Sequence, residues 1–467
     1  MKRNKKQNIK LFALILILFL GIGYATLTTT LKINGTVDVS KASWDVHFEN
    51  VNITDGSVTA NPAPTTDGET TTEMTYTINF TKPGDFFEFT TDIANDGTID
   101  AMIDVISNKV YSSNGQTEIQ LPGYLTSSTT YNDGTPIQQN QMITHETTEK
   151  IKVRIEFKKD IQASDLPSSG DTTIVFKLRG EYKQADENAI PVRVDFANDS
   201  WDDIIALYNN NNLKSLQTAM ENGTTREVQL DLDNNGTAET TAHLRIANLS
   251  TPVECKTSGF SQSACGFVIE FADSISDSAH RMNKFDFSNP ASINGDGNKG
   301  GWEYSDMRAY LNSTIYAAGN IDYSTSGIYN ALPSNLKEKI INTTVISGHG
   351  NRDTSNFTTT DKIYLLSSHE IWEDMDGNQN SGIDYYDTAY SATRQLDYYH
   401  SKGVTTAENY SVAKKNYNNT SWVWSLRTAR SNDYHNFFSV DADGIYGGGS
   451  SYDDKGVSPA FRIAKQN

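Results

Sequence analysis

Apolar residues recur at every second position through much of the first 184 residues. In "KIKVRIEFK", Ile151, Val153, Ile155 and Phe157 alternate with charged residues, which is the pattern of a strand with one buried face. The segments "TYTINF", "FFEFTTDI" and "IVFKLRGEY" follow the same period, and "NDG" turn sequences separate such segments. Because no amphipathic helix interrupts them, the pattern predicts an all-β antiparallel sandwich over residues 28–184.

The pattern changes after residue 184. The stretch "QADENAIP" at residues 184–191 is polar, lacks periodicity and ends in proline, and we predict a linker over residues 185–198. Beyond it, "NDSWDDIIALY" predicts a helix with Ser200 and Asp203 at capping-box spacing, and "EVQLDLDNNGTAETTAHLRIA" predicts a hairpin. Short helices in "SDMRAYLNS" and "LPSNLKEKII" and a buried strand in "DKIYLLS" complete a mixed pattern. We therefore predict a two-domain chain, with an α+β domain over residues 199–467.

Aromatic residues alternate near the end of the chain. In "WVWSLR" a strand would place Trp422 and Trp424 on one face and Arg427 on the other. The closing "GVSPAFRI" would likewise oppose Phe461 to Arg462. Such stripes are most often core, with the arginines paired to carboxylates, and the alternative is the wall of a pocket. In that alternative the ligand-binding candidates are Trp422, Trp424, Arg427, Tyr398, Tyr399 and Arg462.

The first 27 residues have the pattern of an export signal. Five cations precede the uncharged apolar run of residues 11–27, and Gly23 and Ala25 provide a small-x-small cleavage site. Without cleavage, the run would be a single membrane anchor with its cations inside. Either outcome places the rest of the chain outside the cell, secreted or tethered to the membrane.

Charge and cysteine content agree with an extracellular protein. The formal charge of -19 repels nucleic acid and anionic lipid, so neither is an expected partner of the folded part. Cys255 and Cys265 are the two cysteines of the chain and close a short Gly/Ser-containing loop. We predict a disulfide between them, and the alternative is two reduced structural thiols.

No catalytic motif stands out in the sequence. "HEIWE" at residues 369–373 lacks the second histidine of a zinc site, and Ser367 with Glu370 at capping-box spacing explains it without metal. Calcium is the cofactor that the acidic loops could hold, and no other cofactor is expected. The predicted calcium ligands are Asp374, Asp376, Asn378, Asn380 and Asp384. The similar "DLDNNGTAE" fits a hairpin turn better.

Two resemblances follow from particular stretches. "GYATLTTTLKINGTVDVS" and "PGDFFEFTTDIANDGTIDA" resemble the TasA/camelysin group of exported Gram-positive proteins, which implies an immunoglobulin-like or jelly-roll sandwich and, in some members, matrix fibres. The pieces "SWDDII", "GGWEYSDMRAYLN", "LPSNLKEKI", "TTDKIYLLSSHEI", "RQLDYY", "WSLR" and "GVSPAFRI" resemble a domain of unknown function found in surface proteins of low-GC Gram-positive bacteria. The terminal tryptophan and arginine pattern is also similar to the C-type-lectin and formylglycine-generating-enzyme fold.

Three functions are compatible with these features. The first is a non-catalytic cell-surface protein whose second domain recognises an extracellular glycan or protein, because tyrosines and tryptophans in loops suit sugar binding. The second is a fibre subunit that self-assembles through strand exchange in the sandwich. The third is an enzyme of unknown reaction, and we expect the chain not to be one.

Overall fold

The computed structural model describes residues 42–66, 71–162, 166, 173–186, 188–276, 278–283, 297–374, 387–406 and 408–464. The predicted signal segment lies outside these residues. Within them, no helix combines the length and the apolar character that crossing a bilayer requires. The described chain from Trp44 onward belongs to one compact unit, which contains two separate hydrophobic cores.

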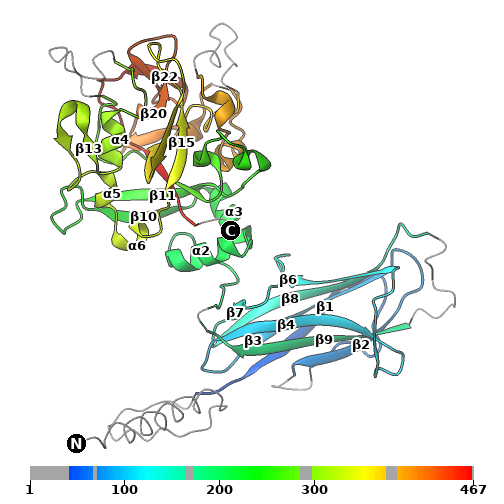
Figure 1. Ribbon diagram of the computed structural model, residues 1–467. Helices are drawn as coiled ribbons and strands as arrows, with labels where there is room; N and C mark the ends of the chain where they lie inside the picture. The colour runs from blue at the N-terminus through cyan, green and yellow to red at the C-terminus, as the bar shows by residue number, and fades with distance from the viewer. Residues whose placement is uncertain are drawn as a thin grey trace, which may run out of the picture. The chain divides into compact units, whose positions relative to one another are not determined.

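The first core lies between two antiparallel sheets of a sandwich (Figure 1). One sheet has the order β1-β3-β8-β6, and the other has the order β2-β9-β4-β5 with β7 paired to β4. The strands are β1 (Val46–Gly56), β2 (Glu73–Asn79), β3 (Phe86–Asn95), β4 (Ala101–Tyr111), β5 (Glu118–Ile119), β6 (Leu125–Tyr131), β7 (Met142–Ile143), β8 (Thr147–Phe157) and β9 (Thr173–Gln184).

Side-chain alternation accounts for this core as predicted. Ile151, Val153, Ile155 and Phe157 of β8 are buried, and the residues between them are half-buried or exposed. Tyr76 of β2 fills the space between the sheets, where its ring lies 5.2 Å from that of Phe89 and 5.5 Å from that of Phe176. The antiparallel β-structure predicted for this part of the chain is therefore confirmed.

The second core is built on a five-stranded antiparallel sheet with the order β10-β11-β12-β23-β17 (Figure 1). Its strands are β10 (Thr225–Leu230), β11 (Thr240–Asn248), β12 (Val268–Phe271), β23 (Pro459–Arg462) and β17 (Ile363–Leu365). Smaller antiparallel sheets accompany it: β13 (Ile315–Tyr316) with β14 (Ile321–Asp322), β15 (Thr343–Ser347) with β16 (Phe357–Asp361), β18 (Lys415–Tyr417) with β19 (Thr420–Trp422), and β20 (Trp424–Ala429) with β21 (Asn436–Val440) and β22 (Tyr446–Ser450).

Short helices surround these sheets. They are α2 (Trp201–Asn209), α3 (Lys214–Asn222), α4 (Asp306–Leu311), α5 (Ile328–Ala331), α6 (Ser334–Lys337) and α8 (Asp397–Ser401). The 3-10 turns are η2 (Val253–Lys256), η3 (Gln262–Ala264), η4 (Ala317–Gly319), η6 (Tyr390–Ala392) and η7 (Ser411–Ala413). Ser200 caps α2 as predicted by accepting the backbone N–H of Asp203, and α3 and α8 pack against β11.

Two local predictions differ from the structure. The predicted linker buries every second side chain of "IPVRVDF", namely Ile190, Val192, Val194 and Phe196, because its period of two is that of an ordered extended segment. Strand alternation also does not extend through "WVWSLR". Trp422 ends β19 and is 44% exposed, whereas all six residues of β20 are buried, Arg427 included, because both faces of that strand are covered.

Candidate functional site

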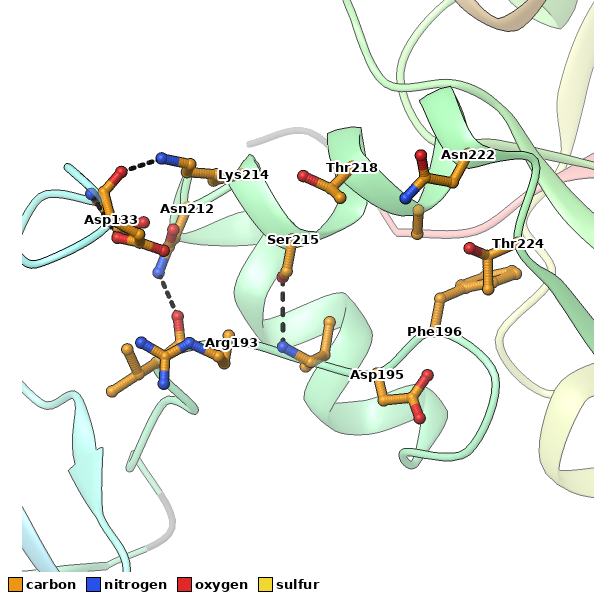
Figure 2. A pocket seen from close by; sticks show the side chains of 14 residues that line it. Asp133, Arg193, Asp195, Phe196, Asn212, Lys214, Ser215, Thr218, Asn222 and Thr224 are labelled. Carbon is orange, nitrogen blue, oxygen red and sulfur yellow. Dashed lines mark hydrogen bonds between the residues drawn. The ribbon is translucent and has the colours of Figure 1, made fainter. Parts of the chain in front are cut away.

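The candidate site is a polar pocket of about 330 Å³ where residues 192–196 run beside helix α3. Ser215, Thr218 and Asn222 are spaced three and four residues apart, so they share one face of α3 and line the pocket (Figure 2). The other lining residues are Asp133, Thr135, Val192, Arg193, Val194, Asp195, Phe196, Asn212, Lys214, Ala219 and Thr224. Most of these side chains carry a hydroxyl, an amide or a charge.

Hydrogen bonds hold the walls of this pocket in place. The buried Asn212 side chain donates to the carbonyl of Val192 at 2.9 Å, and the Ser215 hydroxyl accepts the backbone N–H of Val194 at 3.2 Å (Figure 2). These bonds fix the extended segment against α3. Thr218 and Asn222 remain exposed on the helix face that lines the pocket. The pocket can therefore offer hydroxyl and amide groups to a polar ligand.

A second pocket, of about 270 Å³, lies between the start of α4 and β13. Tyr304 is 45% exposed and Ile315 is 64% exposed at its edge. Arg308 also lines it, but its guanidinium donates to Asp361 at 2.7 Å and to the Glu303 carbonyl at 3.0 Å. This pocket is more apolar at its rim than the first.

The structure does not gather the predicted ligand-binding residues around one opening. Trp422 lies on the surface, with its ring 6.2 Å from that of Tyr417. Trp424 is fully buried and donates its indole N–H to the Ala413 carbonyl. Tyr398 and Tyr399 lie on α8 and are buried as well. The arrangement agrees with the interpretation of most of these aromatics as core.

Arg427 is fully buried and pairs with Glu370. Both terminal nitrogens of the guanidinium donate to the carboxylate, at 2.6 Å each, in the bidentate geometry that favours arginine. Arg427 also donates to the carbonyls of Ile346 and Leu365, and Ser263 donates to Glu370 at 2.5 Å. The glutamate of "HEIWE" is therefore a structural ion-pair partner, and its carboxylate also accepts the N–H of Ser367 at 2.9 Å, which is half of the predicted capping box.

A second buried network surrounds Glu270 of β12. Its carboxylate accepts from Arg245 at 2.8 Å, Lys415 at 2.7 Å and the Tyr399 hydroxyl at 3.0 Å. The Lys415 ammonium also donates to the Phe271 carbonyl and the Ser458 hydroxyl, each at 2.7 Å. Burial lowers the pKa of Lys415 to about 8, although the charge of Glu270 opposes this shift.

This second network was not predicted from the sequence. The available signal was a lone carboxylate inside an apolar run, "FVIEFA", because Glu270 could enter a core only with cationic partners. The partners themselves carry no such signal. Lys415 lies 145 residues away along the chain, and only the fold brings it to Glu270.

The predicted disulfide between Cys255 and Cys265 is present. Of the predicted calcium ligands, Asp374 is described, and Asp376, Asn378, Asn380 and Asp384 lie outside the described residues. Among the described residues, three carboxylates come together in the loop of the β10–β11 hairpin. Ligand atoms of Asp231, Asp233 and Glu239 lie within 4.8 Å of one another, and carboxylate oxygens of this kind are what a calcium ion prefers.

Comparison with known proteins identifies one segment of the chain. Residues 283–465 match a protein family described as a domain of unknown function, DUF6273. The match includes the predicted pieces from "GGWEYSDMRAYLN" to "GVSPAFRI", but "SWDDII" lies before it, so the matched segment is shorter than the predicted domain. No curated protein and no solved structure matches the chain.

We predict that a single substitution in the Arg427–Glu370 pair lowers the free energy of unfolding more than the substitution of both residues does. We expect Glu370→Gln to destabilise the fold by about 3–5 kcal/mol, because it leaves the guanidinium buried without a counter-charge. The double variant Glu370→Leu/Arg427→Met removes both charges and should cost less than the single variant. Urea unfolding measures both. Equal losses for the two variants would contradict a role for the unpaired charge.

The same pair predicts acid sensitivity. Burial would raise the pKa of Glu370, but the charge of Arg427 and hydrogen bonds from Arg427, Ser263 and Ser367 outweigh it and hold the pKa below its usual range. A lowered pKa in the folded state means that this stabilisation is present above the unfolded value of about 4.3 and is lost as the pH falls through the folded value.

We therefore expect the free energy of unfolding to decrease as the pH is lowered below about 4.5. The decrease should be less steep in the Glu370→Leu/Arg427→Met double variant. Urea unfolding at a series of pH values from 7 to 3 compares the two proteins. Parallel pH profiles would show that other carboxylates cause the loss.

Proposed function

We propose that the chain is an exported, non-catalytic recognition protein with two domains, in which the β-sandwich carries an α+β domain that binds a glycan. The polar pocket beside α3 is the observation that carries this proposal. Its volume of about 330 Å³ falls within the usual size range of small-molecule sites. We assign the glycan to this pocket because sugar hydroxyls need neighbouring groups that donate and accept hydrogen bonds.

The exposed groups of the pocket suit such a ligand. Thr218 and Asn222 present a hydroxyl and an amide, each able both to donate and to accept. Asp195 adds a carboxylate, and hydrogen bonds from Asn198 and Ala197 lower its pKa, so it accepts hydrogen bonds at neutral pH. A pocket with these groups on fixed walls binds a polar ligand without first having to order itself.

Three further features support the proposal. The disulfide suits an oxidising compartment outside the cell. The signal-like first 27 residues suit export. Four of the most deeply buried charged groups form two ion pairs, Arg427 with Glu370 and Lys415 with Glu270, which favours a structural role for them over catalysis. The C-type-lectin-like fold remains our proposal for the second domain.

Glycan binding can be tested with matched variants on α3. We expect the full chain to retain neutral oligosaccharides on a glycan array, and Thr218→Ala/Asn222→Ala to weaken that binding about tenfold or more in calorimetry. Gln217→Ala is the control, because Gln217 is exposed on the same helix and does not line the pocket. The glycan should be recovered chemically unchanged. Equal binding by the double variant and the control, or no retention of any glycan, would reject the proposal.

One observation favours fibre assembly as a second candidate function. Among the described strands, β1 and β6 are the end strands of the sheet β1-β3-β8-β6, and β1 is 11 residues long. A long edge strand can pair with another chain. Assembly would give a sedimentation coefficient that rises with protein concentration, and substitution of proline for the edge residue Asn52 of β1 should reduce that rise. A chain that stays monomeric at all concentrations would exclude this candidate.

A further inference from the structure

The second pocket, which residues 303–309 and residues 314–317 line, has no part in the proposed function. Its volume of about 270 Å³ is a little below the usual lower limit of about 300 Å³ for small-molecule sites, so it suits a small ligand or a single side chain. Its lining residues lie in the segment 283–465 that matches the family of unknown function, whereas those of the pocket beside α3 lie outside it. The matched segment therefore has a cavity of its own.

The backbone on the acidic side of this pocket is held on both sides of Glu303. The indole N–H of the fully buried Trp302 donates to Asp361 at 2.9 Å, and the guanidinium of Arg308 donates to the same carboxylate at 2.7 Å. Ser305 also accepts the backbone N–H of Arg308, at 3.1 Å. Because these contacts fix the chain, the backbone at Glu303 does not have to become ordered when a ligand binds.

Glu303 gives the pocket a negative charge that the protein does not balance. Arg308 is the one cation among the described residues that line the pocket, and its charge is already paired with that of Asp361. Arg308 donates to the main-chain carbonyl of Glu303, at 3.0 Å. In the part of the chain that the structure describes, no side chain forms an ion pair or a hydrogen bond with the half-exposed Glu303 carboxylate. A ligand with a positive charge is therefore attracted to the pocket, and an anion is repelled.

Apolar surface lies beside this charge. Tyr304 and Ile315 are exposed at the rim, and the buried Tyr316 forms part of the wall. A short hydrocarbon chain that covered these side chains would remove apolar surface from water. The exposed Thr314 adds a hydroxyl that makes no hydrogen bond with the described residues and can accept one from an N–H group.

We propose that this pocket binds a primary ammonium group at the end of a short hydrocarbon chain. Glu303 supplies the counter-charge, Thr314 accepts a second hydrogen bond, and Tyr304 and Ile315 contact the chain. An ammonium group has three donors and no acceptor, which suits a carboxylate that can only accept. A metal ion would find a single carboxylate among the lining side chains and would gain nothing from the apolar rim. The site is separate from the pocket beside α3 and does not depend on the glycan proposal.

The lysine side chain of a peptide and a free alkylamine share this chemistry, so the test compares butylamine and Nα-acetyl-lysine amide with butanol on the full chain. At neutral pH both amines are charged and should give calorimetric binding. Butanol has the same chain length as butylamine without the charge and should bind at least about tenfold more weakly. Tighter binding of Nα-acetyl-lysine amide than of butylamine would identify a peptide lysine, and equal or weaker binding would identify a free amine.

Glu303→Gln removes the charge and keeps the shape of the side chain. It should unfold at the wild-type temperature, because the Glu303 carboxylate binds no described residue, and it should bind both amines about tenfold more weakly. Thr314→Val removes the second acceptor and should weaken binding severalfold. Glu338→Gln is the matched control, because Glu338 is exposed and lines neither pocket, and it should leave amine binding unchanged.

Three results would overturn the proposal. They are amine binding by Glu303→Gln or Thr314→Val that equals binding by Glu338→Gln, binding of butanol as tight as that of butylamine, and no saturable binding of either amine up to about 50 mM. Thr218→Ala/Asn222→Ala should not affect amine binding, which separates this proposal from the glycan proposal.

Discussion

The buried ion pair between Arg427 and Glu370 is the interaction on which the second core most depends. It joins β20 to the turn after β17, and the same guanidinium holds the carbonyl of Ile346 on β15. Ser263, two residues before Cys265 of the disulfide, binds both partners. Four segments that are far apart in the sequence therefore meet at one charge pair. Such a pair adds little net stability over an apolar replacement, but it specifies which segments may meet, since wrong pairings would leave a charge buried.

The charged groups that are paired inside the core differ from the polar groups that are available to bind a ligand. Glu270 fixes β12, β11 and the β18 strand through Arg245 and Lys415, and these groups are turned away from solvent. The polar side chains of α3 that line the pocket lie in a different part of the chain and are partly or fully exposed. Loss of one partner of a core ion pair should therefore destabilise the protein, whereas loss of a pocket side chain should leave its stability nearly unchanged. Substitution of a pocket side chain can therefore test ligand binding in a protein that is still folded.

The sequence predicted the sandwich better than the second core for a physical reason. Strands β2 and β8 have one face in the core, so a period of two is visible, as in Ile151 to Phe157. Strands β20 and β23 are buried on both faces, and alternation there carries no information about exposure. Trp422 and Trp424 look equivalent in sequence, yet a strand boundary between them places one on the surface and the other in the core.

The candidate site was less predictable because its parts are distant or unremarkable in sequence. Arg427 and Arg462 have the same local context, an arginine after apolar residues, and only the structure shows that Arg427 meets a carboxylate, whereas Arg462 donates to the Gln262 side chain and forms no ion pair with a described residue. The pocket beside α3 uses Thr218 and Asn222, which carry no motif, and the segment "IPVRVDF", which forms one of its walls, falls within the predicted linker. Helix α3 itself was not predicted.

Glu370 and Arg427 lie 57 positions apart in the sequence, and their pairing has an evolutionary consequence. A change at either position alone leaves one buried charge without a partner. A protein with only one of the two substitutions is therefore less stable than both the original protein and the double variant. The two positions should therefore be inherited as a unit. Substitutions in the loops between these two positions can accumulate independently. Replacement of the pair by apolar residues requires both substitutions together.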